Sequence, residues 1–419
     1  MSEIKTCKIS DAVTLHSYID PRFKTMRLAV NLLVPITRQR AAQYALLPSL
    51  VSRATREYPD YTALSARLAG LYGASLGSGV QKIGDHQVLG LSVGGIASRY
   101  AFDGEDMFAQ LTGLLFSVLF DPLKDSGGLF PEDGFSQEKR QQLEQKDADF
   151  SDKMIYAHQR CHELLFEGSP AGVNRLGSRE DIEALTRQGL TPAWDELLRE
   201  ARFEIFALGD CRPDVDLLRE RFAPLGSYRK LGAVAYTQPQ EVRRVTEEQP
   251  VAQSKLSIAF RVQASPKDRL LYNLMAAVLG GSPSSKLFLN VREKQSLCYY
   301  CNSMYTWAGG AMFIESGVET ARLEQAEQAI MEQVAAMQRG EITQEELRHT
   351  QLYLCNSLRA VGDSLHRVED WYLGRTFDEE GLSPAWAVDR LMQYTVNDVV
   401  EAANRLQPAV VYTLKGGAG

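Results

Sequence analysis

The sequence predicts an α+β protein built from two related halves, each with helices packed on a mainly antiparallel β-sheet. The strand pattern at 27–34 recurs at 255–262, an offset of 228 residues, and at the same offset Tyr44 matches Tyr272 in the helical segment that follows. Strands are separated by pairs or triplets of helices, which is typical of α+β folds rather than of regular strand–helix alternation. Two halves also explain a length of 419 residues, more than one hydrophobic core usually serves.

The first half is predicted to begin and end on strands. Residues 27–34 alternate as a half-buried strand does, and a polar loop leads from them to the helix that contains Tyr44. Near the end of this half, residues 192–201 (PAWDELLREA) predict a helix. The apolar run that follows, 202–208, predicts a strand that ends at Gly209.

The second half repeats this order after its own first strand. Thr395 and Asp398 match the pattern of a capping box, which predicts a helix over 396–406, and residues 409–414 predict the closing strand. Long periodic segments predict further helices in the middle of each half, at 138–149, 153–166, 322–339 and 344–358.

A polar stretch separates the two halves. We expect residues 1–225 to form the N-terminal half, 226–253 a linker, and 254–419 the C-terminal half. Within the linker, residues 234–236 (VAY) predict a short strand.

Charge and composition exclude several classes of protein. The chain has 46 Lys and Arg against 53 Asp and Glu, a net charge of −7 without long runs of one sign, which disfavours nucleic-acid binding. Charged residues interrupt the first twenty positions, and the longest strongly apolar run, 111–120, is about half a membrane span. We therefore expect a cytoplasmic protein with no membrane partner and with its six cysteines reduced.

Most searches for a catalytic motif fail. The sequence has no phosphate-binding P-loop, no GxSxG nucleophile elbow and no GxGxxG fingerprint after a strand. Cys298 and Cys301 have CxxC spacing without a second pair, so we interpret them as small buried residues of an aromatic strand. His158 and His162 share a helix face, but Cys161 occupies the position where a zinc hydrolase has its glutamate. We assign no metal site there, and whether the two histidines bind any metal stays open.

The most specific signal is GGSPSSKLFLNVREKQSLCY at 280–299. It closely resembles the segment of the insulinase/pitrilysin-type metallopeptidases in which a GG(x)SSxLF loop and helix lead to R-E-K-x-x-L-x-Y. The resemblance covers essentially the whole chain, including the duplicated half, the strand end at 208–210 and the segment GEITQEEL at 340–347. It implies the duplicated, ferredoxin-type α+β fold of that family, in which two chains or two linked halves enclose a peptide.

The resemblance implies that Arg292 and Tyr299 bind substrate. A guanidinium group and a phenol hydroxyl can both donate hydrogen bonds to peptide carbonyl oxygens, holding an extended substrate in register and stabilising charge that develops on the scissile carbonyl. The spacing of seven residues between the two side chains is that of the family motif.

The zinc motif of the family's active members is absent. Those members carry HxxEH on the first helix of the N-terminal half, shortly before a segment that resembles YPDYTAL at 58–64, and counting back places the motif on ALLPS at 45–49. The two histidine positions then hold Ala45 and Ser49, and the glutamate that activates water is replaced by Pro48. Alanine cannot bind zinc, a lone serine hydroxyl is a poor ligand, and proline bends a helix.

The family's third zinc ligand is a glutamate seven residues after another glutamate on a later helix. If Glu138 is the first of the pair, the ligand position holds Gln145, whereas a shift of one residue would place Glu144 there. A single carboxylate cannot assemble the site in either case. We therefore expect no catalytic residue and no bound metal in this chain.

A chain that keeps the Arg/Tyr pair without the zinc motif resembles the non-catalytic half of a heterodimeric peptidase. We predict a subunit that binds substrate and activates its partner but is inactive alone. The partner is a homologous, zinc-bearing peptidase subunit that supplies HxxEH. The substrate is a peptide. The peptide's identity and homodimer formation by the isolated chain stay open. The alternative is a scaffold or regulatory protein without peptide chemistry, like respiratory-complex core subunits of this fold or relatives linked to protein modification. A third hypothesis is an autonomous enzyme around His158 and His162.

Overall fold

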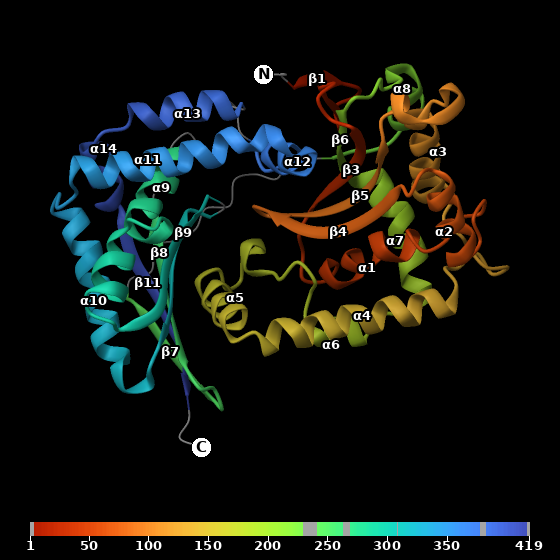
Figure 1. Cartoon of the computed structure of the whole chain (residues 1–419). Coiled ribbons are helices and arrows are strands. Elements are labelled where there is room, and N and C mark those ends of the chain that lie inside the picture. The colour runs from red at the N-terminus through yellow and green to blue at the C-terminus, as the bar shows by residue number, and fades with distance from the viewer. Residues whose placement is uncertain (1–3, 229–240, 263–268, 308, 378–382, 417–419) are drawn as a thin grey trace. The chain divides into compact units, whose positions relative to one another are not determined.

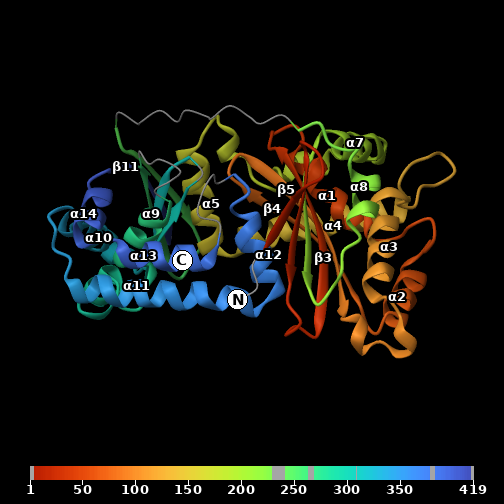
Figure 2. The same ribbon diagram turned by 90° about the horizontal axis from the view of Figure 1, so that it is seen from above.

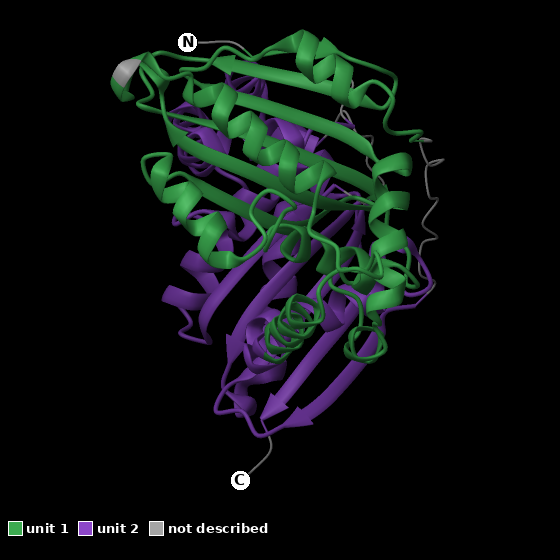
Figure 3. Cartoon of the chain, turned by 90° about the vertical axis from the view of Figure 1, so that its right-hand side faces the viewer, with its two compact units in different colours: residues 1–147, 173–232 green, residues 148–172, 233–419 purple. Residues whose placement is uncertain are grey.

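The chain forms two compact units in the computed structural model, which describes residues 4–228, 241–262, 269–307, 309–377 and 383–416. Unit 1 comprises residues 1–147 and 173–232, and unit 2 comprises residues 148–172 and 233–419 (Figure 3). Each unit has its own β-sheet with helices packed against it (Figure 1). The predicted α+β fold of two related halves is therefore confirmed.

Unit 1 contains, within the described residues, a six-stranded sheet in the order β1-β2-β6-β3-β5-β4. Its strands are β1 (Lys5–Lys8), β2 (Val13–Ile19), β3 (Thr25–Pro35), β4 (Ser75–Ile83), β5 (His86–Ile96) and β6 (Arg202–Gly209). Its helices are α1 (Ala41–Val51), α2 (Tyr61–Gly70), α3 (Met107–Phe120), α4 (Glu132–Ser151, whose last residues belong to unit 2), α6 (Arg179–Glu183), α7 (Arg187–Glu200) and α8 (Val215–Phe222).

The core of unit 1 lies between one face of this sheet and helices α1, α3 and α7. Alternate residues of β3, among them Leu28, Val30 and Leu32, are fully buried in that core, as the period of a strand requires. Trp194 of α7 is buried with them, and its indole nitrogen donates a hydrogen bond to the carbonyl oxygen of Leu119 over 3.2 Å. These contacts hold α1, which contains the predicted motif positions 45–49, against the sheet.

Unit 2 contains, within the described residues, a five-stranded sheet in the order β7-β11-β8-β10-β9. Its strands are β7 (Arg243–Gln249), β8 (Ser254–Val262), β9 (Cys298–Thr306), β10 (Ala311–Val318) and β11 (Leu406–Gly416). Its helices are α5 (Lys153–Leu165), α9 (Arg269–Ala276), the π-helical turns η5 (Ala277–Gly281) and η6 (Leu287–Glu293), α10 (Leu323–Gln338), α11 (Gln344–Arg359), α12 (Leu365–Leu373), α13 (Pro384–Gln393) and α14 (Val396–Ala403).

The two sheets share one topology. The order β2-β6-β3-β5-β4 of unit 1 is matched by β7-β11-β8-β10-β9 of unit 2. In each sheet the first pair, β2 with β6 or β7 with β11, is parallel, and the following pairs are antiparallel. The duplication, which was inferred from the first strand and helix and from the closing helix and strand of each half, therefore extends to five strands.

Both faces of the unit 2 sheet are covered where β8 and β11 cross it. Figures 1 and 2 show α9, α10, α11, α13 and α14 on one side and α5 on the other. Ile258 and Phe260 of β8 are buried in the first layer, whereas Ala259 packs with Ala157 and Cys161 of α5. This explains why β8 is apolar on both faces.

Most predicted elements are found. Residues 27–34 lie in β3 and 255–262 in β8, and the helices predicted at 322–339 and 344–358 are α10 and α11, the latter opened by the capping box of Thr343 and Glu346. The closing strand begins at Leu406, three residues earlier than expected.

The predicted linker and the predicted boundary of the first half differ from the structure. The stretch 226–253, expected to be a linker, contains strand β7, whose residues are all exposed or half-exposed and so lack the apolar alternation that marks a strand. Residues 148–172 lie within the predicted first half but are grouped with unit 2. The strand predicted at 234–236 lies outside the described residues.

Among the described helices, none is both long enough and apolar enough to cross a membrane.

Candidate functional site

Helix α1 holds the three positions that were predicted to align with the HxxEH motif. Ala45 is buried and offers no ligand atom. Pro48 lies inside the helix and has no backbone N–H. The hydroxyl of Ser49 donates a hydrogen bond to the carbonyl oxygen of Leu46 over 3.0 Å, within its own helix. The three side chains therefore supply neither imidazole nor carboxylate to this face of α1.

Helix α4 runs opposite α1 and fills this region with structural contacts. Arg53, one turn beyond Ser49, reaches the Glu138 carboxylate with an Nη1–Oε1 distance of 2.7 Å and the Gln137 amide oxygen over 2.9 Å. The Gln142 amide nitrogen donates to the carbonyl oxygen of Ala42 over 3.3 Å. It also donates to the carbonyl oxygen of residue 176 over 3.1 Å. Glu138 is thus paired with an arginine.

The two positions considered for the third ligand are both exposed. Glu144 is exposed and lies 3.5 Å from Arg140 in a solvent-exposed ion pair. Gln145 is likewise exposed, and its placement as the ligand position stays a prediction. No three His, Cys, Asp or Glu side chains of the described chain are grouped so that they could hold a metal ion. The residues present around α1 and α4 do not fit a catalytic zinc ion.

Arg53 was not predicted as part of this region. Its signal in the sequence is a basic residue one helical turn after the motif positions, while the acidic residue that it pairs with lies 85 positions away. The pairing follows from the packing of α1 on α4, which periodicity alone does not specify.

The Gly280–Tyr299 motif forms a firmly held segment of unit 2. A Cβ atom on Gly280 would lie 2.7 Å from the backbone nitrogen of Ser303, so only glycine allows this close approach. Lys286 is buried and bonds to Glu346 over 2.9 Å, and Asn290 donates to Gln333 over 2.7 Å. These polar contacts tie η6 to α11 and α10.

The turn between η6 and β9 is also fixed. Ser296 has a φ of +51°, and its carbonyl oxygen accepts a hydrogen bond from Arg322 over 3.0 Å. The side-chain amide of Gln295 donates to the carbonyl oxygen of Asn290 over 3.0 Å. The backbone nitrogen of Leu297 donates to the carbonyl oxygen of Val291 over 3.2 Å. The segment that separates Arg292 from Tyr299 therefore has a defined conformation.

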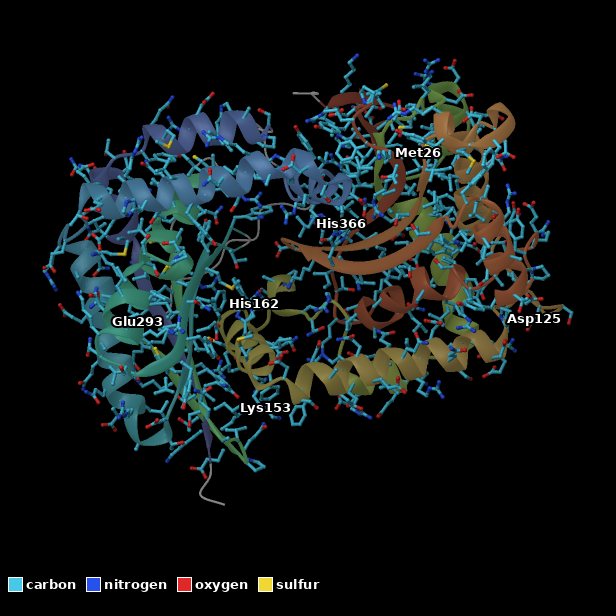
Figure 4. All side chains as sticks on the ribbon, in the orientation of Figure 1. Met26, Asp125, Lys153, His162, Glu293 and His366 are labelled. Carbon is cyan, nitrogen blue, oxygen red and sulfur yellow. The ribbon has the colours of Figure 1, made fainter. Side chains whose placement is uncertain are left out.

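Arg292 and Tyr299 both point to solvent from this segment. Arg292, on η6, lies over the ring of Phe288 at 4.8 Å, and its nearest carboxylate in the described chain is that of Glu293, 3.8 Å away. Tyr299, on edge strand β9, is 66% exposed, and no described residue bonds to its hydroxyl. Figure 4 marks Glu293, the neighbour of Arg292. Substrate binding by the pair stays a prediction, but neither side chain is consumed by an internal ion pair at close range.

The histidines of α5 have a structural environment. His158 Nδ1 lies 2.9 Å from Glu315 of β10, whose same oxygen accepts a hydrogen bond from the Ser257 hydroxyl over 2.7 Å. His162, labelled in Figure 4, stacks on the ring of Phe313. The two imidazoles thus attach α5 to the sheet of unit 2, in which the Glu315 side chain is mostly buried.

Comparisons with known proteins agree with the motif. A family model described as the peptidase M16 inactive domain matches residues 184–354. YmfF of Bacillus subtilis (strain 168), named a probable inactive metalloprotease, is 26% identical over 415 residues, covering 97% of this chain and 96% of that protein. YmxG of the same organism, named an uncharacterized zinc protease, is 27% identical over 210 residues, covering 47% of this chain and 50% of that protein.

Two crystal structures have the same fold over essentially the full chain. A conserved protein from Enterococcus faecalis V583 has a TM-score of 0.90 and 26% identity, with 100% of both chains covered. A peptidase M16 inactive domain from Pseudomonas fluorescens has a TM-score of 0.80 and 18% identity, with 99% of both chains covered. Together with the family model, these similarities show that the chain is similar to inactive M16 peptidase domains and has their fold.

Proposed function

We propose that this chain is a non-catalytic, substrate-binding subunit that activates a zinc-bearing M16 peptidase. Arg292 and Tyr299 contact the peptide, and the partner subunit supplies the HxxEH motif and the zinc ion. The observation that carries the proposal is the contrast between two sites: the metal positions on α1 hold no ligands, whereas the Arg/Tyr pair is exposed on a rigid segment.

The region of α1 and α4 supports the non-catalytic part of the proposal. Hydrolysis by a metallopeptidase needs ligands for the metal and a carboxylate that activates water. Here Pro48 stands where that carboxylate belongs, and Arg53 binds Glu138. A buried carboxylate that has no metal needs a positive partner, which Arg53 provides.

The environment of Arg292 and Tyr299 supports the binding part. The guanidinium has donors to spare because its one carboxylate neighbour in the described chain is 3.8 Å distant. The Tyr299 hydroxyl is available in the same way. Both stand near the start of β9, an edge strand, whose outer side offers further backbone donors and acceptors to an extended peptide.

The two relatives from Bacillus subtilis support the partner. One is named an inactive metalloprotease and the other a zinc protease, and both match this chain. An organism that has both kinds of chain has the two components that the proposed division of labour needs.

Activity of a reconstituted pair tests the proposal. The chain is coexpressed with an HxxEH-bearing M16 peptidase of the same genome, and cleavage of a quenched fluorescent peptide library is measured. We expect Arg292→Ala to lower kcat/KM by about 10- to 100-fold, because a hydrogen bond from a charged donor contributes about 1.5–3 kcal/mol. Tyr299→Phe loses one neutral hydrogen bond, so we expect it to lower kcat/KM by about fivefold.

Two matched controls separate this effect from a loss of folding. Arg390 also lies over an aromatic ring, that of Tyr394 at 5.0 Å, and Tyr353 is an exposed tyrosine of α11. Arg390→Ala and Tyr353→Phe should leave kcat/KM unchanged. The proposal fails if the Arg292 and Tyr299 variants behave like these controls in an active pair, a result that favours a scaffold role.

Restoring the motif tests the assignment of the metal positions. The triple variant Ala45→His/Pro48→Glu/Ser49→His should bind zinc weakly, since it has two imidazoles and no third ligand. Adding Gln145→Glu should strengthen zinc binding at least about tenfold and bring it to one ion per chain. Calorimetry measures the affinity, and circular dichroism checks the fold. If the triple variant binds as tightly as the quadruple one, another carboxylate supplies the ligand and the placement at Gln145 is wrong.

A further inference from the structure

Cys298 and Cys301 lie on edge strand β9 with a β-bulge between them. Cys301 is opposite Ser316 of β10, but Cys298 is opposite Val318, and the register shifts between Gly317 and Val318. From Cys298 to Tyr300, strand β9 advances by two residues while β10 advances by one, so residue 299 is the extra residue of the bulge. On a regular strand two residues three positions apart face opposite sides. The bulge turns both cysteines to the same side.

The bulge also shortens the distance between the two cysteines. Their partners on β10 are two residues apart, which corresponds to roughly 6.6 Å along a strand, instead of roughly 10 Å for three regular steps. A disulfide joins Cα atoms separated by about 4.4–6.8 Å. The separation expected from the register therefore falls at the upper end of the range that a disulfide spans.

The two thiols have different reactivities. The pKa of Cys298 is lowered to about 7, first by the hydrogen bond from Cys301, with partial burial opposing and with Ser316 and the positive charge of Arg292 assisting. Cys301 is 3% exposed, and its pKa is raised well above the ordinary value because the Cys298 thiolate and burial both disfavour its ionisation. A half-exposed thiolate beside a buried thiol is the arrangement of a reactive and a resolving cysteine.

Other buried cysteines of the chain lack this arrangement. Burial raises the pKa of Cys161 to about 12 and that of Cys211 to about 12, so neither thiol forms an appreciable amount of thiolate near neutral pH. Neither has a second cysteine within three residues in the sequence. The pair on β9 is therefore distinguished by both its geometry and its chemistry.

We propose that Cys298 and Cys301 form a dithiol site that hydrogen peroxide oxidises to a disulfide. The Cys298 thiolate attacks one peroxide oxygen, the O–O bond breaks, and Cys298 becomes a sulfenic acid while hydroxide leaves and takes up a proton to form water. The sulfur of Cys301 then attacks the sulfenic sulfur, and the S–O bond breaks as a second water forms. In total two thiols are oxidised and one peroxide is reduced to two waters.

Closing this bridge fixes the conformation of the bulge, whose extra residue is Tyr299. The oxidation site does not depend on a peptide-binding role for that side chain, since the site is defined by the two sulfur atoms and the strand that carries them. If peptide binding by Tyr299 is disproved, the oxidation of the two cysteines can still occur. If the cysteines do not oxidise, the proposed peptide binding is unaffected.

Peptide mapping of the full-length protein tests the proposal. The purified chain is treated with a small excess of hydrogen peroxide, its remaining thiols are alkylated with iodoacetamide, and it is digested with trypsin. Cleavage after Lys294 and Arg322 releases the peptide 295–322, which contains both cysteines and no others. We expect this peptide to become lighter by two hydrogen atoms, to resist alkylation, and to return to the alkylatable form with dithiothreitol, which does not reverse methionine oxidation.

Three variants complete the test. Cys301→Ser should stop at the sulfenic acid of Cys298, which dimedone traps, and Cys298→Ser should give neither product. Cys7→Ser, on β1 of the other unit, should form the bridge as the wild type does. The proposal is overturned if both thiols of peptide 295–322 stay alkylatable after peroxide treatment, or if the Cys301→Ser variant yields no dimedone adduct at Cys298.

Discussion

The contact between Arg53 and Glu138 gives a quantitative prediction for the region of α1 and α4 in which the zinc-motif positions are predicted to lie. Glu138→Gln keeps the size and the hydrogen-bonding oxygen of the side chain but removes its charge. The Arg53 side chain is 25% exposed and that of Glu138 is 8% exposed, so the pair is only partly screened by water. Two unit charges about 4 Å apart interact by roughly 4 kcal/mol at an effective dielectric of 20, and the cost of desolvation offsets part of this. We expect a loss of about 1–2 kcal/mol in the free energy of unfolding.

The same helix offers a matched control. Glu144 pairs with Arg140 at 3.5 Å, and both side chains are about two-thirds exposed. Exposed pairs contribute little, so Glu144→Gln should cost less than about 0.5 kcal/mol. Urea unfolding, followed by far-UV circular dichroism, compares the midpoints at equal slopes. If the two variants lose the same stability, the Arg53–Glu138 contact is not a structural ion pair, and the account of why Glu138 persists without a metal is refuted.

Two further predictions concern pH and packing. Burial lowers the pKa of His86 from 6.5 to about 4, so the unfolded chain takes up a proton first as the pH falls. Stability should therefore fall between about pH 6.5 and pH 4, by up to about 3 kcal/mol. His86→Gln, which keeps a donor for the Tyr228 hydroxyl, should remove that part of the pH dependence in urea titrations; equal pH profiles would contradict the assignment. Gly280→Ala should cost at least about 1–3 kcal/mol because its Cβ would meet backbone at 2.7 Å. At Gly281 the nearest atom is 3.4 Å away, so Gly281→Ala should lower the thermal midpoint much less, and equal losses would rule out the clash.

Elements that depend on local patterns can be predicted from the sequence, whereas features that depend on tertiary contacts cannot. The strands around residues 30 and 258 follow from alternation and the helix at 344–358 follows from its periodicity, both of which neighbouring residues determine. Strand β7 was missed because none of its side chains is buried. The grouping of α5 with unit 2 depends on which sheet its apolar face covers, and the bulge at Tyr299 depends on the register with β10. None of these is encoded in the spacing of one segment.

The two parts of the candidate site differ in whether internal contacts explain their residues. In the α1–α4 region the contacts themselves account for the residues, since a partly buried carboxylate is costly without a positive partner and Arg53 supplies one. Stability does not account for Arg292 or Tyr299 in this way, because each is exposed and forms no close hydrogen bond among the described residues. The buried lysine, the close glycine contact and the fixed turn around them hold the segment in one conformation whatever these two side chains are. The proposed peptide-binding role would account for two unused donors on a rigid segment, because the carbonyl oxygens of a peptide backbone can accept hydrogen bonds from both side chains.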